Sequence, residues 1–354
     1  MGAQRVTAYD IAVATFALSR PRLQARPGVE KLRNALLFTL FWLAATPCFA
    51  EAATAGTAGI EVHDATPAFW KFWDAADGKP EQERIRLFRE IVVAANPELY
   101  ESTVLNKSAL AGDGRAATAD AIVGAYLRDV LPHIPRMKEI SRLIHDDFQN
   151  YAAEFKTRFP DFAPKSAVYF TVSLFNFDGA TRGVNGKTAL LFGIDGIARF
   201  HRPEESLKVL FDHELFHQYH LQFNQDDTDE ATPLWMPLWE EGLATYVSQQ
   251  MNPGTTEAQV LMSPTLADAA RPMTAALARE LLENLDSTDR DEYAAFFYSR
   301  NKRPDLPPRC GYYLGYRAVK ALAAGRTLAQ LALLQGPELK AAIRKTLEPW
   351  SKPL

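Results

Sequence analysis

The feature that most constrains this chain is a pair of histidines four residues apart, His213 and His217, within the pentapeptide HELFH. Apolar residues recur around it at helical spacing, and no Gly or Pro interrupts the run as far as Phe223. On a helix, residues four apart lie one turn apart on the same face, so both imidazoles can reach one metal ion. Glu214 follows the first histidine, and its carboxylate can face a water molecule beside that metal. The sequence therefore predicts a metal-binding helix, with Pro203 suited to its first turn.

A second stretch, WEEGLATY at residues 239–246, shows helical spacing of apolar positions and two adjacent acids. A catalytic zinc ion takes three protein ligands and keeps one position open, so two histidines need one further ligand. Glu240 and Glu241 point about 100° apart on a helix, and only one of them can ligate easily. We therefore expect a carboxylate from this second helix to complete the site.

Together the two stretches resemble the paired motifs of the gluzincin zinc metallopeptidases, whose second motif contains Glu-Gly or Asn-Glu-Gly followed by Ala and an aromatic residue. The resemblance implies that Glu241, directly before Gly242, joins His213 and His217 as ligands of a single Zn²⁺ ion. It also implies hydrolysis of a peptide bond by a zinc-activated water, with Glu214 as the general base.

Three further polar residues are expected around this site. Glu240 stands where the gluzincin motif often has Asn, and Thr245, one turn after Glu241, is expected to hydrogen-bond the outer nitrogen of a zinc histidine. His220 lies a further turn along from His217, about 5 Å away, so we do not expect it to bind the same ion. It either contacts the site or the substrate from outside the ligand set, or it is a helix-end histidine without a special role.

A third helix is predicted to open at CGYYLGYRAVK, residues 310–320. Its Gly-Tyr-x-x-Gly-Tyr run is similar to that of a group of bacterial exported proteins regarded as zinc-dependent proteases. Gly311 and Gly315 are four apart and permit close approach to another helix. Tyr312 and Tyr316 share a neighbouring face, and a phenol near the zinc can donate a hydrogen bond to the developing oxyanion. Tyr316 is the first choice for this role and Tyr312 the second; the alternative is that these tyrosines only pack.

Residues 1–50 have the pattern of a signal peptide. A basic region is followed by the uncharged run Ala35–Thr46 and by small residues three and one positions before a cut after Ala50. Twelve apolar residues are too few to span a bilayer. We therefore expect an exported bacterial protein, periplasmic or secreted, without stable membrane insertion after cleavage; an uncleaved anchor is the alternative.

Charge and cysteine content limit the possible partners. Residues 1–50 carry six basic and two acidic side chains, a net +4, so their removal takes the net charge from −4 to −8. This acidic balance argues against nucleic acid or an anionic membrane as a partner. Cys310 would be the one cysteine left, which excludes an intramolecular disulfide. The expected partner is a peptide or protein substrate, and the sequence leaves the oligomeric state open.

The remaining pattern predicts a predominantly helical α+β protein of zincin-like type. Residues 51–65 are predicted to form a linker, 66–160 a helical N-terminal region, and 165–348 a metallopeptidase-like domain. In the last of these a small β-sheet precedes the HExxH helix, and a helical subdomain follows it. The helical pattern is clearest over Ile85–Asn96, Ala116–Leu131 and Met137–Phe159.

Two strands are predicted before the metal helix, Ala167–Phe175 and Thr188–Ile194. Asp178-Gly179 and Asp195-Gly196 read as turns that bound them. By the gluzincin resemblance, the second strand is expected at the sheet edge, where it would hold the substrate backbone by strand addition. An ordinary core strand is the alternative.

The function predicted from these patterns is that of a zinc-dependent peptidase. The chain lacks the Gly-x-Met-x-Asn element with which aminopeptidase relatives hold a substrate amine, which favours an endopeptidase. Two alternatives remain. One is a zinc-binding but proteolytically inactive module that binds peptides or assists envelope proteins; the other is a zinc hydrolase of a non-peptide substrate.

Overall fold

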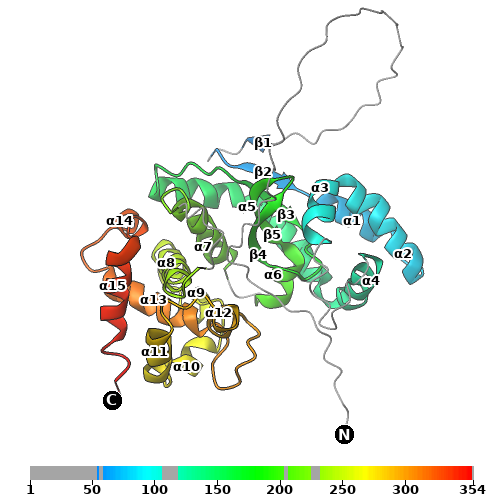
Figure 1. Cartoon of the computed structure of the whole chain (residues 1–354). Coiled ribbons are helices and arrows are strands. Elements are labelled where there is room, and N and C mark those ends of the chain that lie inside the picture. Colours follow the sequence, from blue (N-terminus) through cyan, green and yellow to red (C-terminus); the bar gives the residue numbers. More distant parts are fainter. Residues whose placement is uncertain (1–53, 56–58, 106–118, 203–205, 225–231, 353–354) are drawn as a thin grey trace, which may run out of the picture.

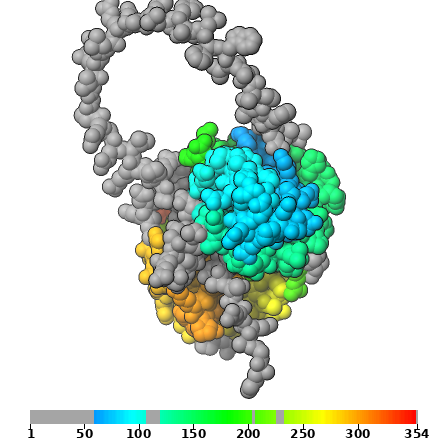
Figure 2. Space-filling view, turned by 90° about the vertical axis from the view of Figure 1, so that its right-hand side faces the viewer, coloured from blue at the N-terminus to red at the C-terminus, as the bar shows by residue number. Residues whose placement is uncertain are grey.

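The computed structural model describes residues 54–55, 59–105, 119–202, 206–224 and 232–352 (Figure 1). The predicted signal peptide, Pro203 and the acidic segment at 226–230 lie outside these residues. The described chain is an α+β protein dominated by helices, as the sequence predicts. A small sheet lies between N-terminal helices on one side and C-terminal helices on the other, and Figure 2 shows the N-terminal helices covering one end.

The sheet has five strands in the described residues, in the order β1-β2-β3-β5-β4. β2, β3 and β5 run parallel, and β1 and β4 pair antiparallel with their neighbours. The strands are β1 (Thr54–Ala55), β2 (Glu61–Asp64), β3 (Ala167–Thr171), β4 (Gly179–Val184) and β5 (Lys187–Gly193). Residues 61–64 thus belong to the sheet, and the expected linker over 51–65 is wrong for that part.

The edge strand differs from the prediction. The second predicted strand corresponds to β5, but β5 lies between β3 and β4, so the expectation that residues 188–194 form an edge is wrong. β4 occupies the edge instead, and it begins at Gly179, where the sequence suggested a turn. Its sequence, GATRGV, lacks the β-branched and aromatic density of a typical strand, and pairing with β5 outweighs that weak propensity.

The first predicted strand is shorter than expected because the chain turns sharply after β3. Leu174 and Phe175 both have left-handed backbone, with φ of 57° and 60°. The buried carboxylate of Asp195 accepts hydrogen bonds from the backbone N–H groups of Ser173 (2.7 Å) and Phe175 (2.6 Å), which holds this turn. Asp195 itself lies in helix α6 (Ile194–Phe200), not in the turn that the Asp195-Gly196 pair suggested.

The N-terminal helices agree in position with the helical pattern, within a few residues at each end where the chain is described. Phe148 of α5 packs against Phe170 of β3, Phe192 of β5 and Phe211 of α7 (Leu207–His220), with ring centres 4.9–6.3 Å apart. This aromatic cluster joins α5, the sheet and α7.

The helical elements of the N-terminal half are α1 (Thr66–Ala75), α2 (Glu81–Phe88), η1 (Arg89–Val93), α3 (Pro97–Leu99), η2 (Tyr100–Val104), α4 (Ala119–Asp129), η4 (Leu131–His133) and α5 (Ile134–Arg158).

The C-terminal half is entirely helical in its described part. It contains α8 (Trp235–Met251), α9 (Glu257–Val260), α10 (Leu266–Ala270), α11 (Thr274–Glu283), α12 (Arg290–Phe297), α13 (Cys310–Leu322), α14 (Leu328–Ala332) and α15 (Gly336–Leu347). One hydrophobic core includes residues from both halves, from Ile60 to Leu347. Among the described helices, none is both long and apolar enough to cross a bilayer.

Helices α8 and α13 cross with their backbones in contact. A methyl group at Gly315 would overlap the carbonyl oxygen of Leu238, and one at Gly242 would lie 2.7 Å from the Cα of Gly315. Gly311, one turn earlier, faces the ring of Phe297. The close helix approach predicted from these glycines is therefore confirmed at Gly315, whose partner is the glycine that follows Glu241, whereas Gly311 makes room for a phenylalanine ring.

We predict that Gly315→Ala will destabilise the protein by about 1–3 kcal/mol, because the added methyl group must push two helix backbones apart. Urea denaturation of the variant measures the change in stability. The zinc affinity of the variant should also fall, because the displaced helix α8 carries Glu241. Gly183→Ala is the matched control, since a methyl group there meets no atom within 4 Å. Equal stability of wild type and Gly315→Ala would contradict the crossing.

Candidate metal site

Helix α7 places the two histidines in the interior of the protein. Of its fourteen residues, all except Lys208 are buried. Such a helix is enclosed on every side, so its polar side chains must find partners within the protein or in a ligand. Asp212 is also buried, and it accepts hydrogen bonds from Lys208 (2.8 Å) and Asn252 (2.7 Å).

His213, His217 and Glu241 converge on one point, as the two motifs predict. The two histidine Nε2 atoms lie 3.1 Å apart, and Glu241 Oε2 lies 3.3 Å from the first and 3.4 Å from the second. Ligands about 2.0–2.1 Å from a tetrahedral zinc ion are separated by about 3.3–3.4 Å, the edge of that tetrahedron. The three ligand atoms therefore already have nearly the spacing of one face of a zinc coordination shell.

The burial and charge of these groups also fit a cation. All three side chains are buried, and Glu241 Oε1 has no hydrogen-bond partner within the described residues. Burial alone would raise the pKa of Glu241, but the charges and hydrogen bonds of the two histidines outweigh it and hold the pKa low. Burial lowers the pKa of His213 to about 4, which favours the neutral imidazole that a metal binds. Burial would also lower the pKa of His217, but the charge and the hydrogen bond of Glu241 raise it to about 9, so a metal ion must displace this proton. With both imidazoles neutral and the carboxylate ionised, the three groups form a suitable donor set for zinc.

Glu214 lies beside the three ligands, with its carboxylate enclosed by the sheet edge. It is buried, and a methyl group at Gly179 would lie 2.8 Å from both Cδ and Oε1 of Glu214. The first residue of β4 thus needs to be glycine so that the carboxylate can occupy this position. Burial raises the pKa of Glu214 to about 7, a value suited to taking and giving a proton near neutrality.

A buried pair that sequence reasoning did not find supports Gly179. Asp178 accepts a hydrogen bond from the Gly179 N–H (2.9 Å) through Oδ1, and its Oδ2 lies 2.8 Å from Nε2 of His201. Burial would raise the pKa of Asp178, but the hydrogen bond and charge of His201 lower it overall, so the carboxylate stays ionised. His201 is buried, as is Asp178. Nothing in the sequence links these residues, which stand 23 positions apart.

The two candidate tyrosines occupy different places. The Tyr312 ring lies nearly parallel to that of His213, with ring centres 6.4 Å apart, and its buried hydroxyl has no partner within the described residues. The hydroxyl of Tyr316 donates a hydrogen bond to Gln249 (2.6 Å), about 12 Å along α8 from Glu241. The preference for Tyr316 is therefore corrected, because one turn of α13 separates the two phenols and only Tyr312 lies beside the ligands.

The outer residues expected around the site are only partly placed as predicted. Thr245 is buried, but neither its hydroxyl nor Nδ1 of His213 has a hydrogen-bond partner in the described structure, so the expected bond between Thr245 and a histidine is not formed. Glu240 is half-buried next to Glu241, and its charge acts on His217. His220 does not join the ligands; it is buried and stacks on Phe216 with ring centres 5.8 Å apart.

Arg309 is a further residue near the site that the sequence did not single out. It precedes α13 with left-handed backbone, φ 60°, and its guanidinium carbon lies 4.1 Å from the centre of the Tyr312 ring. Its charge adds to the lowering of the pKa values of Asp178 and His213, and it opposes part of the rise in the pKa of Glu214. Arg309 therefore brings a positive charge to the edge of the metal site.

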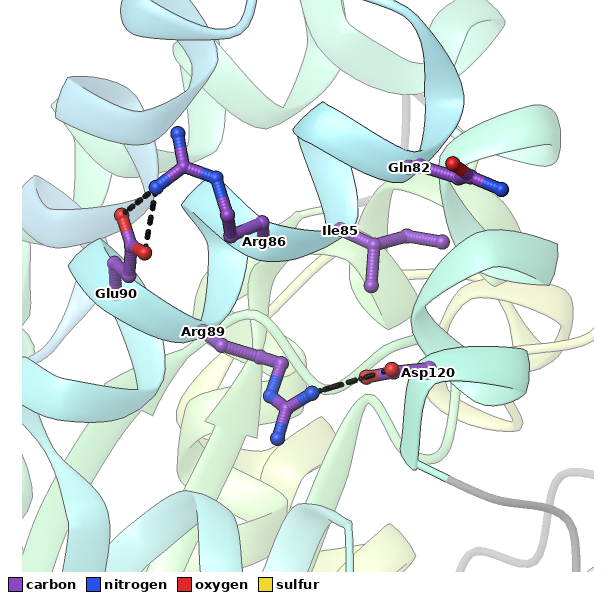
Figure 3. Close-up of a pocket in the computed structure, with 6 residues that line it drawn as sticks. All are labelled: Gln82, Ile85, Arg86, Arg89, Glu90 and Asp120. Atoms are coloured by element: carbon purple, nitrogen blue, oxygen red, sulfur yellow. Dashed lines mark hydrogen bonds and ion pairs between the residues drawn. The ribbon is translucent and has the colours of Figure 1, made fainter.

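A pocket of about 220 Å³ lies elsewhere, among the N-terminal helices (Figure 3). Its two arginines are already paired, Arg86 with Glu90 (2.6 Å) and Arg89 with Asp120 (3.0 Å). These pairs are exposed, so each contributes little to binding or stability. We assign this pocket no role; its lining residues are Gln82, Ile85, Arg86, Arg89, Glu90 and Asp120.

Residues 183–337 match the family model described as "Predicted Zn-dependent protease (DUF2268)". This match supports a zinc-dependent protease family. The matched segment contains the three convergent side chains, Glu214 and Tyr312, whereas Asp178 and Gly179 precede it. No curated protein matches the chain, and no solved structure matches it.

We predict that purified wild-type protein binds one zinc ion and that His217→Ala weakens zinc binding by more than about a hundredfold, because a ligand matters more than the residues that orient it. Metal content after dialysis and competition with a chelator measure this. His220→Gln is the matched control, one turn along the same helix, and should retain zinc. Zinc-free wild-type protein, or zinc lost equally from both variants, would refute the assignment.

Proposed function

We propose that this protein is a zinc-dependent peptidase of gluzincin type. One observation carries the proposal: two histidines and a glutamate from two helices present three ligand atoms 3.1–3.4 Å apart, with a buried acid beside them. The family match supports the same reaction class for residues 183–337.

In this proposal His213, His217 and Glu241 hold the ion, which supplies a Lewis acid that polarises the peptide carbonyl and acidifies water. Glu214 takes a proton from the attacking water and passes it to the leaving amine. The enclosed position of its carboxylate against Gly179 restricts the directions from which that proton can arrive. Tyr312, with its hydroxyl uncommitted within the described residues, donates a hydrogen bond to the developing oxyanion.

We further propose that β4 receives the substrate backbone, the role first expected of residues 188–194. β4 is the edge strand, and Gly179 at its start lies against Glu214. Thr181 accepts a hydrogen bond from Gln218 of α7 (3.0 Å), so the strand continues along the metal-binding helix. The far end is partly covered, because Thr103 of η2 donates a hydrogen bond to the Gly183 carbonyl (2.7 Å). An extended peptide can add to the edge of β4 between Gly179 and Gly183.

The proposal also includes export to the periplasm or medium, as predicted from residues 1–50.

We expect Glu214→Gln to retain zinc and to lower kcat for peptide hydrolysis by about 10²–10⁴-fold, because the amide cannot accept the proton. Digestion of a peptide library followed by mass spectrometry measures the activity, and metal analysis checks the site. A parallel ester library separates a peptidase from a hydrolase of other substrates.

The outcome discriminates between the candidate functions. Zinc-loaded wild type that cleaves peptides, with a zinc-loaded but inactive Glu214→Gln variant, supports the proposal. Zinc-loaded wild type that cleaves no peptide refutes the peptidase, and normal cleavage by Glu214→Gln refutes the general-base role.

We predict that Gly179→Ala folds and binds zinc but hydrolyses peptides at least about tenfold more slowly, because its methyl group must displace the Glu214 carboxylate. The displaced group is the end of a flexible side chain, so the cost in stability should be small. Gly183→Ala, on the same strand, should have normal kcat. Unchanged kcat in Gly179→Ala with retained zinc would show that Glu214 does not act from this position.

A further inference from the structure

The position of Arg309 is held from two sides. Its backbone N–H donates to the Tyr298 carbonyl (3.2 Å), and its guanidinium lies over the Tyr312 ring. The left-handed backbone at this residue is one that glycine or asparagine adopts more readily. The chain therefore maintains a costly backbone conformation at a point where a long cationic side chain reaches the metal site.

The donors of this guanidinium are largely uncommitted. Within the described residues its buried Nε has no hydrogen-bond partner, and no carboxylate of these residues lies within ion-pair distance of the side chain. The nearby acids already have other surroundings: Asp178 pairs with His201, and the Glu214 carboxylate lies against Gly179. Arg309 is only partly buried, so a ligand from solvent can reach it.

This arrangement suits a carboxylate ligand. An arginine stacked on an aromatic face is oriented in advance, and its in-plane N–H groups match the two oxygens of a carboxylate. Tyr312 contacts both groups: the guanidinium lies 4.1 Å from its ring centre, and the His213 ring lies 6.4 Å from it, so an anion held by Arg309 would sit close to the metal ligands.

We propose that Arg309 binds a carboxylate of the peptide substrate and thereby selects anionic peptides. The carboxylate is either the C-terminal group or an Asp or Glu side chain close to the cleaved bond. The inference rests on the proposed function, since it names the substrate class of that same site. Stabilisation of the oxyanion is left to the metal and Tyr312, so Arg309 acts on binding more than on the chemical step.

The test measures binding in the zinc-loaded Glu214→Gln protein, which should not turn peptides over. Hexapeptide mixtures of neutral residues, labelled with an uncharged BODIPY fluorophore, are compared in three forms: a free C-terminal carboxylate, an amidated C-terminus, and an amidated C-terminus with one Glu at any position. Fluorescence anisotropy gives each Kd. We expect one carboxylate-bearing form to bind about 10–100-fold more tightly than the neutral amide.

Variants of Arg309 then test whether this residue causes the preference for a carboxylate. Arg309→Gln should abolish it, Arg309→Lys should retain part of it, and Arg309→Asn provides a second charge-free variant that suits the left-handed backbone. Arg317→Gln is the matched control, because Arg317 lies on the same helix and stacks on Tyr313 (5.6 Å) and Trp350 (4.7 Å) instead. Zinc content confirms that each variant keeps the site.

Equal binding of the three mixtures, or a preference that survives both charge-free variants, would overturn the proposal. A lower kcat with unchanged KM in Arg309→Gln would also overturn it, because that result would mean that Arg309 stabilises the oxyanion of the transition state and does not bind a substrate carboxylate. Because the binding assay contains no hydrolysis step, a carboxylate preference in a protein without peptidase activity refutes only the proposed function. An active peptidase indifferent to carboxylates refutes only the role of Arg309.

Discussion

The metal site depends on one carboxylate, Glu241, buried between two imidazoles. An ionised acid removed from water costs several kcal/mol unless opposite charge and hydrogen bonds compensate it, so α7 and α8 must hold their relative position closely. The residue after this ligand, Gly242, is where α13 crosses α8 with its backbone in contact. A ligand and a helix-packing contact therefore occupy adjacent positions on α8, and Tyr312 is carried by the helix that makes this contact. The relative positions of the three ligands are therefore coupled to the packing of the C-terminal helices.

The ligand set could be predicted from sequence because its geometry is local. The spacing of His213 and His217 follows from helical periodicity, and the acid next to Gly242 follows from the resemblance of its motif. The glycines of α13 likewise predicted a close helix contact, although their partner depends on how the helices pack. The same periodicity could not separate Tyr312 from Tyr316, because residues four apart share a face and differ only in height along the axis. Contact with α8 decides between them.

The sheet edge could not be predicted because it depends on pairings between distant residues. Asp178-Gly179 has the composition of a turn, yet the aspartate binds His201 and the glycine makes room for Glu214. Strand order, too, is invisible to alternation patterns: β5 is a convincing strand whether it lies at the edge or inside. The residues that position Glu214 are thus brought together by tertiary contacts, and two of them, Asp178 and Gly179, lie outside the segment matched by the family model.

Charge balance explains why Arg309, unlike the other charged groups near the metal site, has no partner of opposite charge within the described residues. Asp178 is compensated by His201, and Glu241 by the histidines and the ion they would hold together. In the proposed mechanism Glu214 exchanges a proton, and a permanent ion pair with a guanidinium would hinder this exchange by stabilising the ionised form. Stacking on Tyr312 keeps Arg309 near the site and, within the described residues, out of ion-pair distance of that carboxylate. The cation–π contact offsets part of the cost of the left-handed backbone, on the order of 1 kcal/mol. In the part of the chain that the structure describes, this leaves the positive charge of Arg309 uncompensated at the edge of the metal site, and the ligand that best satisfies such a charge is an anion.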